Sequence, residues 1–178
     1  MEPPAVYLIT GPMAAGKSTV GQLLASRFGR GVWLEGDLFR RSIVSGREDM
    51  TPDASPEALE QLRLRYRLTA AAADRYFEAG FNVVVEDVAA GPILSDYAEM
   101  IHSRPCHVVV LLPSLKAVAA READREHKGY GAWTVEQLYE GFASKTPRIG
   151  LWLDTTDLTP EETVEAILTH TTSRNSPS

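Results

Sequence analysis

The chain has 178 residues, of which 44% are hydrophobic and 24% are charged, so we expect one globular domain with its own core. A formal net charge of −6 disfavours binding to a nucleic-acid backbone, and no stretch approaches the roughly 20 apolar residues of a membrane span. Cys106 is the only cysteine, which excludes an intrachain disulfide and fits a reducing cytoplasm. The N-terminal stretch MEPPAVYLIT lacks the features of a signal peptide. We therefore expect a cytoplasmic protein whose oligomeric state the sequence does not indicate.

Short apolar runs alternate with helical patterns along the chain. Several of these runs are apolar at consecutive positions, which is typical of parallel strands buried on both faces. The predicted strands are residues 6–10, 32–37, 81–88, 107–113 and 151–154. The alternation predicts a three-layer α/β/α fold with a covered parallel sheet.

Capping residues mark where the helices between these strands begin. A helical face follows the first strand, and a long helix is predicted from Ser55-Pro56 to about Ala79, with Gly80 as its stop. Further helix starts are predicted at Ser114, Thr134 and Thr159. The polar segment 44–55 and the glycine-containing segment 126–133 are predicted loops. We expect a flexible tail at about 171–178.

Residues 11–18, GPMAAGKS, match the pattern G-x-x-x-x-G-K-[ST] between a predicted strand and a predicted helix. Glycines let successive N–H groups point inward as an anion nest, and the helix that begins there adds the positive end of its dipole. Lys17 supplies a charge near the β- and γ-phosphates, and Ser18 supplies a hydroxyl for Mg²⁺. The pattern predicts a site for the phosphates of a nucleoside triphosphate. The alternative is a small-residue turn that only links strand to helix.

Carboxylates follow the second and third predicted strands, where a parallel sheet forms its binding edge. Asp37 is a candidate to accept a proton from an attacking hydroxyl or to help hold the metal, and the alternative is a helix N-cap. Glu86 and Asp87 end an apolar run, as in a Walker B segment that reaches Mg²⁺. Adjacent strand residues point to opposite sides, so only one of the two can face the metal. We favour Asp87, with Glu86 as an alternative base.

Cationic and hydroxyl side chains near the later strands are further candidates. Arg121 and Arg125 share a helix face, and they are predicted either to close over the triphosphate or to form a solvated face paired with nearby glutamates. Arg40 either touches an anionic acceptor or lies on the surface. Thr155, in the loop after the last strand, either lies beside the adenine or belongs to an ordinary strand-to-helix loop.

Taken in order and spacing, GPMAAGKSTVGQLLA, LEGD, VVVEDV, AAREADRE and LDTT resemble the small P-loop kinases. Within that group the chain is most similar to the chloramphenicol-phosphotransferase-like proteins, and it also resembles gluconate and shikimate kinases. The resemblance covers most of residues 5–170. It implies a five-stranded parallel sheet in the order 2-3-1-4-5, a single P-loop kinase domain over 1–178, and a lid at about 121–146.

The resemblance also implies ATP and Mg²⁺ as cofactors and phosphoryl transfer to a hydroxyl of a small molecule, an antibiotic or a metabolite. By analogy Asp37 is the base, Lys17 and the lid residues Arg121 and Arg125 are catalytic, and Ser18 and Asp87 hold the metal. Asp37, Arg40 and Asp87 are expected to bind the acceptor. The residues expected to contact the nucleotide are Gly11, Pro12, Met13, Ala14, Ala15, Gly16, Lys17, Ser18, Thr19, Arg121 and Thr155.

Two alternatives stay open from the sequence. A nucleoside monophosphate-type kinase needs cations for a second phosphate, and the chain offers a set of arginines for it: Arg40, Arg41, Arg63, Arg65 and Arg67. A regulatory nucleotide-hydrolysing switch is the other alternative, although no Asn/Thr-Lys-x-Asp element for guanine is present. The acceptor itself is not identified, because residues 40–70 do not map onto the family pattern.

Overall fold

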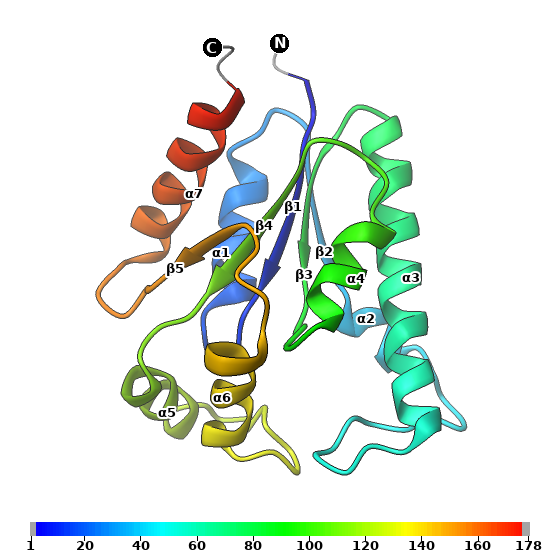
Figure 1. Ribbon diagram of the computed structural model, residues 1–178. Helices are drawn as coiled ribbons and strands as arrows, with labels where there is room; N and C mark the ends of the chain where they lie inside the picture. The colour runs from blue at the N-terminus through cyan, green and yellow to red at the C-terminus, as the bar shows by residue number, and fades with distance from the viewer. Residues whose placement is uncertain (1–2, 176–178) are drawn as a thin grey trace.

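The structure, a computed structural model, describes residues 3–175. Its centre is a five-stranded, all-parallel sheet in the order β2-β3-β1-β4-β5 (Figure 1). The strands are β1 (Val6–Thr10), β2 (Gly31–Glu35), β3 (Asn82–Glu86), β4 (Cys106–Leu111) and β5 (Leu151–Leu153). The predicted α/β fold class and strand order are therefore confirmed.

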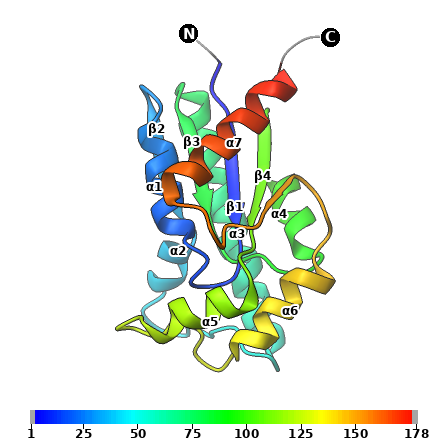
Figure 2. The ribbon, with the colours of Figure 1, turned by 90° about the vertical axis from the view of Figure 1, so that its left-hand side faces the viewer.

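Helices cover both faces of the sheet and one of its ends. They are α1 (Lys17–Ser26), α2 (Asp37–Arg41), α3 (Pro56–Glu78), α4 (Ile93–Met100), α5 (Leu115–Ala123), α6 (Val135–Lys145) and α7 (Pro160–Asn175). Figures 1 and 2 show α1 and α7 on one face and α3 and α4 on the other, with α5 and α6 beyond the carboxyl ends of the strands. Within residues 3–175, no helix combines the length and apolarity that crossing a bilayer requires.

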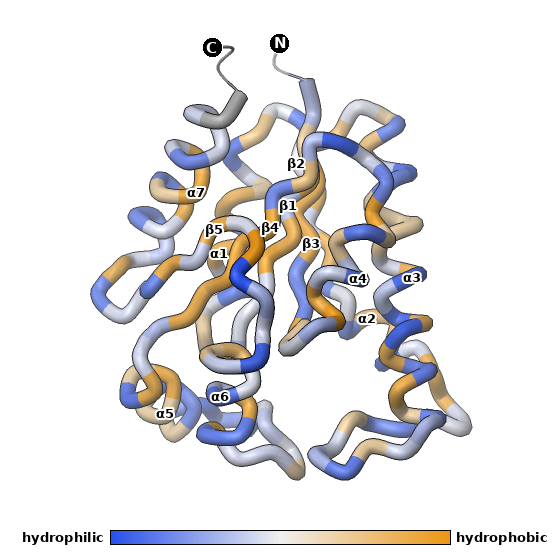
Figure 3. Tube along the Cα trace, in the orientation of Figure 1, coloured by the Kyte–Doolittle hydropathy of each residue, from blue (hydrophilic) through white to orange (hydrophobic). Residues whose placement is uncertain are grey.

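The strands are apolar at consecutive positions because both sides of the sheet are covered. In β1, Leu8 packs into the cluster that includes Tyr66 and Leu94 of α3 and α4. The next residue, Ile9, packs into the opposite cluster, which includes Leu24 and Ile167 of α1 and α7. Figure 3 shows hydrophobic residues concentrated in the central strands. Two separate apolar layers, one on each face, therefore fix the position of the sheet and of the polar residues at the carboxyl ends of its strands.

Side-chain caps fix the helix starts that the sequence predicted. The Ser55 hydroxyl accepts from the Ala58 amide at the start of α3, and Thr134 exchanges reciprocal hydrogen bonds with Gln137 at the start of α6. Helix α4 has no side-chain cap and no counterpart among the predicted elements. Helix α7 runs through Asn175 and so includes the first five residues of the tail expected at about 171–178, whose flexibility stays a prediction. Residues 176–178 lie outside the described residues.

The parallel sheet brings all five carboxyl-terminal strand ends to one edge. Segments that follow β1, β2, β3 and β5 lie there, together with α5, α6 and the loop 44–55 (Figure 1). The start of β1 and the end of α7 lie at the opposite end of the molecule. The carboxylates and the glycine-rich loop singled out from the sequence follow directly on these strand ends, whereas Arg63, Arg65 and Arg67 lie on α3 and Arg121 lies on α5.

Candidate functional site

The loop that joins β1 to α1, residues 11–16, adopts backbone angles that suit glycine. Gly16 has a φ of 88°, and Ala14 has a φ of 65°, which is uncommon for a residue with a side chain. A Cβ atom at Gly11 would overlap the carbonyl of Leu111, because the two backbones pass close together. Gly16 is the N-cap of α1 and offers no capping side chain, so the first-turn N–H groups have no side-chain partner there. The loop therefore has the geometry of an anion nest at a helix N-terminus. We call residues 11–18 the phosphate loop.

Lys17 is buried within this loop and donates a hydrogen bond from Nζ to the Pro12 carbonyl at 3.0 Å. Burial lowers the pKa of Lys17 to about 8, and the carboxylates of Glu86 and Asp87 only partly offset that effect. No carboxylate within residues 3–175 forms an ion pair with it. A buried ammonium without an ion-pair partner is a strong site for an incoming anion.

Ser18 and Glu86 meet at the mouth of the phosphate loop. The Ser18 hydroxyl donates to Glu86 Oε1 at 2.7 Å, and Trp33 Nε1 donates to Oε2 of the same carboxylate at 3.1 Å. Burial raises the pKa of Glu86. Glu86, and not Asp87, therefore faces Ser18, and which of the two carboxylates holds a metal stays a prediction. The side chains of Glu86 and Asp87 do take different partners, as the strand pleat requires.

Asp87 is buried on the other side, against α3. Its Oδ1 accepts from Arg65 Nη2 at 2.5 Å and from the Val88 amide at 2.9 Å, and its Oδ2 lies 3.3 Å from the hydroxyl of Tyr97. Burial raises the pKa of Asp87 although Arg65 opposes that shift. A Cβ atom at Gly36 would overlap this carboxylate, so the glycine before Asp37 makes room for it.

Asp37 begins α2 at the end of β2 and lies among arginines. Its carboxylate accepts from Arg40 Nε at 2.5 Å, and Arg65 and Arg41 lie 3.7 Å away. Burial raises the pKa of Asp37, but these guanidinium groups outweigh burial and hold the pKa below its ordinary value. The side chain makes no N-cap hydrogen bond, so the capping alternative is not what the structure shows.

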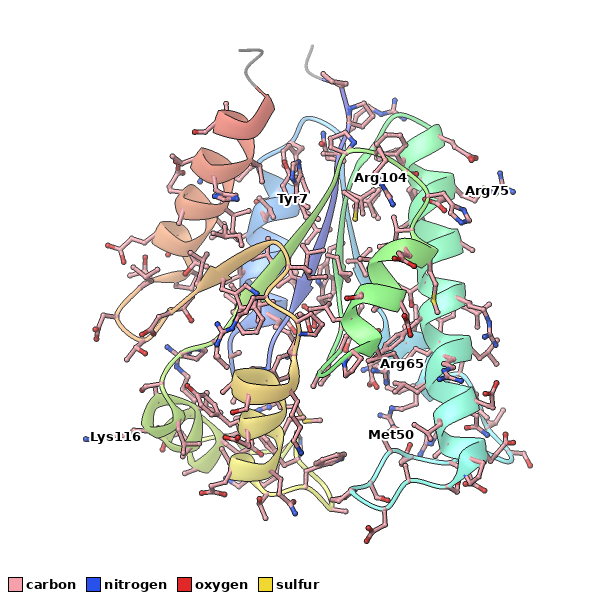
Figure 4. The ribbon with its side chains drawn as sticks, viewed as in Figure 1. Tyr7, Met50, Arg65, Arg75, Arg104 and Lys116 are labelled. Atoms are coloured by element: carbon pink, nitrogen blue, oxygen red, sulfur yellow. The ribbon has the colours of Figure 1, made fainter. Side chains whose placement is uncertain are left out.

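These charges form one connected group, which we call the ion-pair cluster. Figure 4 shows Arg65 extending from α3 toward the carboxyl end of β3, and Met50 on the neighbouring loop 44–55. The members of the cluster are Glu35, Asp37, Arg40, Arg41, Arg47, Asp49, Arg65 and Asp87.

A cavity of about 260 Å³ lies on the opposite side of the phosphate loop. Arg121 reaches it from α5 and donates to the Thr155 carbonyl at 3.3 Å. The Thr155 hydroxyl is buried and has no hydrogen-bond partner among the residues that the structure describes. The residues that line the cavity are Ala15, Gly16, Thr19, Val20, Arg121, Thr155, Leu158, Pro160 and Thr163. Half-apolar walls next to an anion nest suit a flat heterocycle joined to phosphates.

The segment between α5 and α6 closes against the phosphate loop. The Tyr130 hydroxyl donates to the Met13 carbonyl at 2.8 Å. Buried Glu122 accepts from the Gly129 amide at 2.7 Å and from Arg125 at 3.3 Å, which fixes the start of the segment. The charge of Arg125 lowers the pKa of Lys17, so the two cations are within electrostatic reach.

The same segment also contacts the loop 44–55. Trp133 Nε1 donates to the Met50 carbonyl at 3.2 Å. Residues 129–133 therefore touch both the phosphate loop and the neighbourhood of the ion-pair cluster. The movement expected of a lid at 121–146 stays a prediction.

The structure brings most of the sequence-predicted residues together. The phosphate loop, Arg121 and Thr155 surround one cavity or adjoin it, and Asp37, Arg40 and Asp87 belong to the ion-pair cluster. Arg65 was considered only as a phosphate ligand, and its bridging position between Asp37 and Asp87 was missed. The signal was available, because Arg65 lies on the same face of α3 as Ala58 and Thr69, which are buried seven residues before it and four residues after it.

Ser18 and Glu86 together offer oxygen ligands for a divalent ion beside the phosphate loop. Within the described part of the chain, no group of three or more His, Cys, Asp or Glu side chains is arranged to hold a metal ion. The Ser18 hydroxyl and the Glu86 carboxylate are 2.7 Å apart, and both are donors of the kind that Mg²⁺ prefers. Since Mg²⁺ usually takes its other ligands from phosphates and water, this pair fits a nucleotide-borne ion.

Comparisons with known proteins agree with this geometry. Residues 6–140 match the AAA_33 family, described as an AAA domain. A sugar kinase from Janibacter sp. HTCC2649 superposes with a TM-score of 0.69 at 21% identity and covers 94% of both chains. A gluconokinase from Sinorhizobium meliloti 1021 gives 0.64 at 20% identity, over 98% of this chain and 95% of the other.

A third structure, the Mycobacterium tuberculosis APS kinase in complex with AMPPNP and APS, gives a TM-score of 0.68 at 16% identity, over 95% of this chain and 98% of the other. No match was found among curated proteins. At these identities the solved structures show a shared fold, which is the one implied by the resemblance to P-loop small-molecule kinases. The family match covers well over half of the chain, and the protein therefore belongs to the AAA_33 family of P-loop domains.

Proposed function

We propose that the protein is an ATP- and Mg²⁺-dependent kinase that transfers the γ-phosphate to a hydroxyl group of a small molecule, an antibiotic or a metabolite. One observation carries the proposal: the ammonium of Lys17, which forms no ion pair within residues 3–175, lies between a cavity on one side and the ion-pair cluster on the other. Phosphoryl transfer needs a site for the nucleotide that donates the phosphoryl group and a site for the molecule that accepts it, with a cation between the two. The sugar and gluconate kinase neighbours support this assignment at the level of fold.

The nucleotide is proposed to lie along the phosphate loop with its base in the cavity. Arg121 would cover the base, and the unpartnered hydroxyl of Thr155 would gain a hydrogen-bond partner from it. Backbone N–H groups of the loop and of the first turn of α1 would bind the phosphates. Met13 and Thr19 would contact the nucleotide from either end of the loop.

Ser18 and Glu86 are the residues that would hold Mg²⁺ on the nucleotide. When bound, the ion would supply positive charge between the β- and γ-phosphates. Glu86 replaces Asp87 in this role because Asp87 is occupied by Arg65 and Tyr97.

The acceptor hydroxyl is proposed to bind at Asp37, whose carboxylate would orient it and take its proton. A pKa held low by neighbouring arginines keeps Asp37 ionised, so it can accept hydrogen bonds at neutral pH. Lys17 and Arg125 would stabilise the charge that spreads over the transferring group. Most of the rate enhancement in such a loose transition state comes from positioning and electrostatics.

A pair of measurements tests the proposal. Calorimetric titration with Mg-ATP should show binding, and a screen of hydroxylated metabolites and antibiotics should find compounds that trigger ADP release. Absence of Mg-ATP binding would overturn the assignment of the phosphate loop. ADP release that needs no acceptor and responds instead to a protein partner would indicate a regulatory switch.

A further inference from the structure

The arginines near Asp37 are already engaged by carboxylates. Arg40 binds Asp37 at 2.5 Å and Asp49 at 2.7 Å, and Arg65 binds Asp87 at 2.5 Å. Two further pairs, Arg41 with Glu35 at 3.1 Å and Arg47 with Asp49 at 3.5 Å, complete the ion-pair cluster. The cluster thus holds four guanidinium groups and four carboxylates, so its formal charge sums to zero.

The paired arginines of the ion-pair cluster differ from the cation of the phosphate loop. Lys17 has a carbonyl as its hydrogen-bond partner and no ion pair within residues 3–175, as suits a group that receives phosphate. An anionic acceptor at the ion-pair cluster would instead compete with the carboxylates that already pair with each guanidinium. Breaking the largely buried pair of Arg65 and Asp87, with side chains 11% and 2% exposed, would leave a charge without its partner.

The part of the cluster that solvent reaches presents a donor beside an acceptor. The side chains of Asp37 and Arg40 are 32% and 31% exposed, and they are hydrogen-bonded to each other. A carboxylate accepts hydrogen bonds and a guanidinium donates them, whereas each hydroxyl group can do both. Two neighbouring hydroxyl groups therefore match this pair without disturbing its charge balance.

We propose that the acceptor is an uncharged polyhydroxyl compound, bound through neighbouring hydroxyl groups at Asp37 and Arg40, and not a phosphorylated or carboxylated molecule. This inference rests on the proposed kinase function and names the chemical class that the acceptor site takes. It argues against the nucleoside monophosphate alternative, because that reaction needs guanidinium groups free for a second phosphate.

Matched acceptors test the inference directly. ADP release with Mg-ATP is measured for sets that share one carbon skeleton: glucose, gluconate and glucose 6-phosphate, then adenosine and AMP. Binding of each compound to the protein loaded with Mg-AMPPNP is measured by calorimetry. The expected result is that uncharged polyols bind and support turnover more strongly than their charged counterparts. Preference for the phosphorylated or carboxylated members, or failure of every uncharged polyol to bind, would overturn the inference.

A charge-removing variant sharpens the test. Arg40 pairs with two carboxylates, Asp37 and Asp49, and Asp49→Asn removes the second of these ion pairs. Because Asp49 lies on an exposed loop, the variant should still fold. The ratio of kcat/KM for the phosphorylated acceptor to that for the uncharged one should rise roughly fivefold, the size expected for one exposed ion pair. Asp53→Asn is the matched control, because Asp53 is exposed on the same loop and has no ion pair within residues 3–175. An unchanged ratio in Asp49→Asn would contradict the inference.

The outcomes separate this inference from the function it rests on. If Mg-AMPPNP binds and charged acceptors alone are phosphorylated, the kinase assignment stands and the acceptor class is wrong. If uncharged polyols bind beside the nucleotide and no ADP forms, the acceptor class stands and the kinase assignment is wrong.

Discussion

The loop after β1 presents mainly backbone groups, whereas the segments after β2 and β3 present charged side chains that bind one another. In the phosphate loop, Gly11 and Gly16 shape the chain, and Lys17 has no carboxylate partner in the described range 3–175. In the ion-pair cluster, Asp37 and Asp87 are both held by arginines. We infer from this difference that the phosphate loop receives a charged group and that the ion-pair cluster positions uncharged groups. The predictions below aim to disturb one side while leaving the other intact.

The largest effect is expected from Lys17→Ala. Phosphoryl transfer should fall on the order of 10³-fold, because a cation aimed at the transferring group is lost from a buried site. Acceptor-dependent ADP release measures the effect, and circular dichroism checks the fold. Lys116→Ala is the control, since Lys116 projects outward from α5 (Figure 4). A Lys17→Ala enzyme with normal turnover would remove the basis for the donor site.

Asp37→Asn should disturb the ion-pair cluster and lower turnover by somewhat less than Lys17→Ala does. Turnover should drop about 10²-fold, because the amide cannot take the acceptor's proton, while Mg-ATP affinity stays unchanged. Steady-state kinetics and nucleotide titration together make the measurement. Asp96→Asn, at an exposed position of α4, serves as the control. Equal losses of turnover and of nucleotide affinity would instead place Asp37 beside the metal.

Gly36→Ala tests the packing beneath the ion-pair cluster. The added methyl group would collide with the Asp87 carboxylate and displace its pair with Arg65, at a cost of about 2 kcal/mol in the free energy of unfolding. Denaturant unfolding gives this value, and the KM for the acceptor should rise with it. Gly29→Ala has open space for its methyl group and should change the stability by less than about 0.5 kcal/mol. Similar stabilities for the two variants would argue against the close approach of Gly36 and Asp87.

The smallest effect is a pH dependence confined to the phosphate loop. The pKa of Lys17 is about 8 in the free protein because of burial, and bound phosphates should raise it. Above pH 8 the free ammonium has lost its proton, so binding has to restore that proton and becomes weaker. Affinity for Mg-AMPPNP should therefore fall about tenfold between pH 7 and pH 9. Calorimetry at both pH values should show this fall in the wild type and a much flatter profile in Lys17→Ala.

The phosphate loop was predictable from sequence because its geometry depends on neighbours in the chain. Glycines at fixed spacing, a strand before them and a helix after them mark the nest in the sequence, whereas the close approach of Gly11 to Leu111 is visible only in the fold. The same holds for the helix starts at Ser55 and Thr134, whose caps lie three residues away. Helix α4 was missed because it begins after Pro92 with no capping side chain.

The ion-pair cluster was not predictable because its members come together only in the folded chain. Arg65 and Asp87 are 22 residues apart, and the sequence does not say which strand face either one meets. The choice between Glu86 and Asp87 depends on strand pleat and register, and a shift of one residue exchanges the two sides. Trp33 next to Glu86 and Tyr97 next to Asp87 decide the matter in the structure.

Residues 129–133 form two hydrogen bonds to other parts of the site: Tyr130 donates to the Met13 carbonyl of the phosphate loop, and Trp133 donates to the Met50 carbonyl of the loop 44–55. The segment therefore contacts both the proposed nucleotide site and the neighbourhood of the proposed acceptor site. A rearrangement of residues 129–133 that changes one of these contacts would also change the other. Binding of a ligand at one of the two proposed sites would then alter the affinity of the other site. Thermodynamic reciprocity then sets a firm condition: whatever factor the nucleotide adds to acceptor affinity, the acceptor must add to nucleotide affinity. For the proposed kinase we therefore expect cooperativity between nucleotide and acceptor, equal in both directions and carried by residues 129–133.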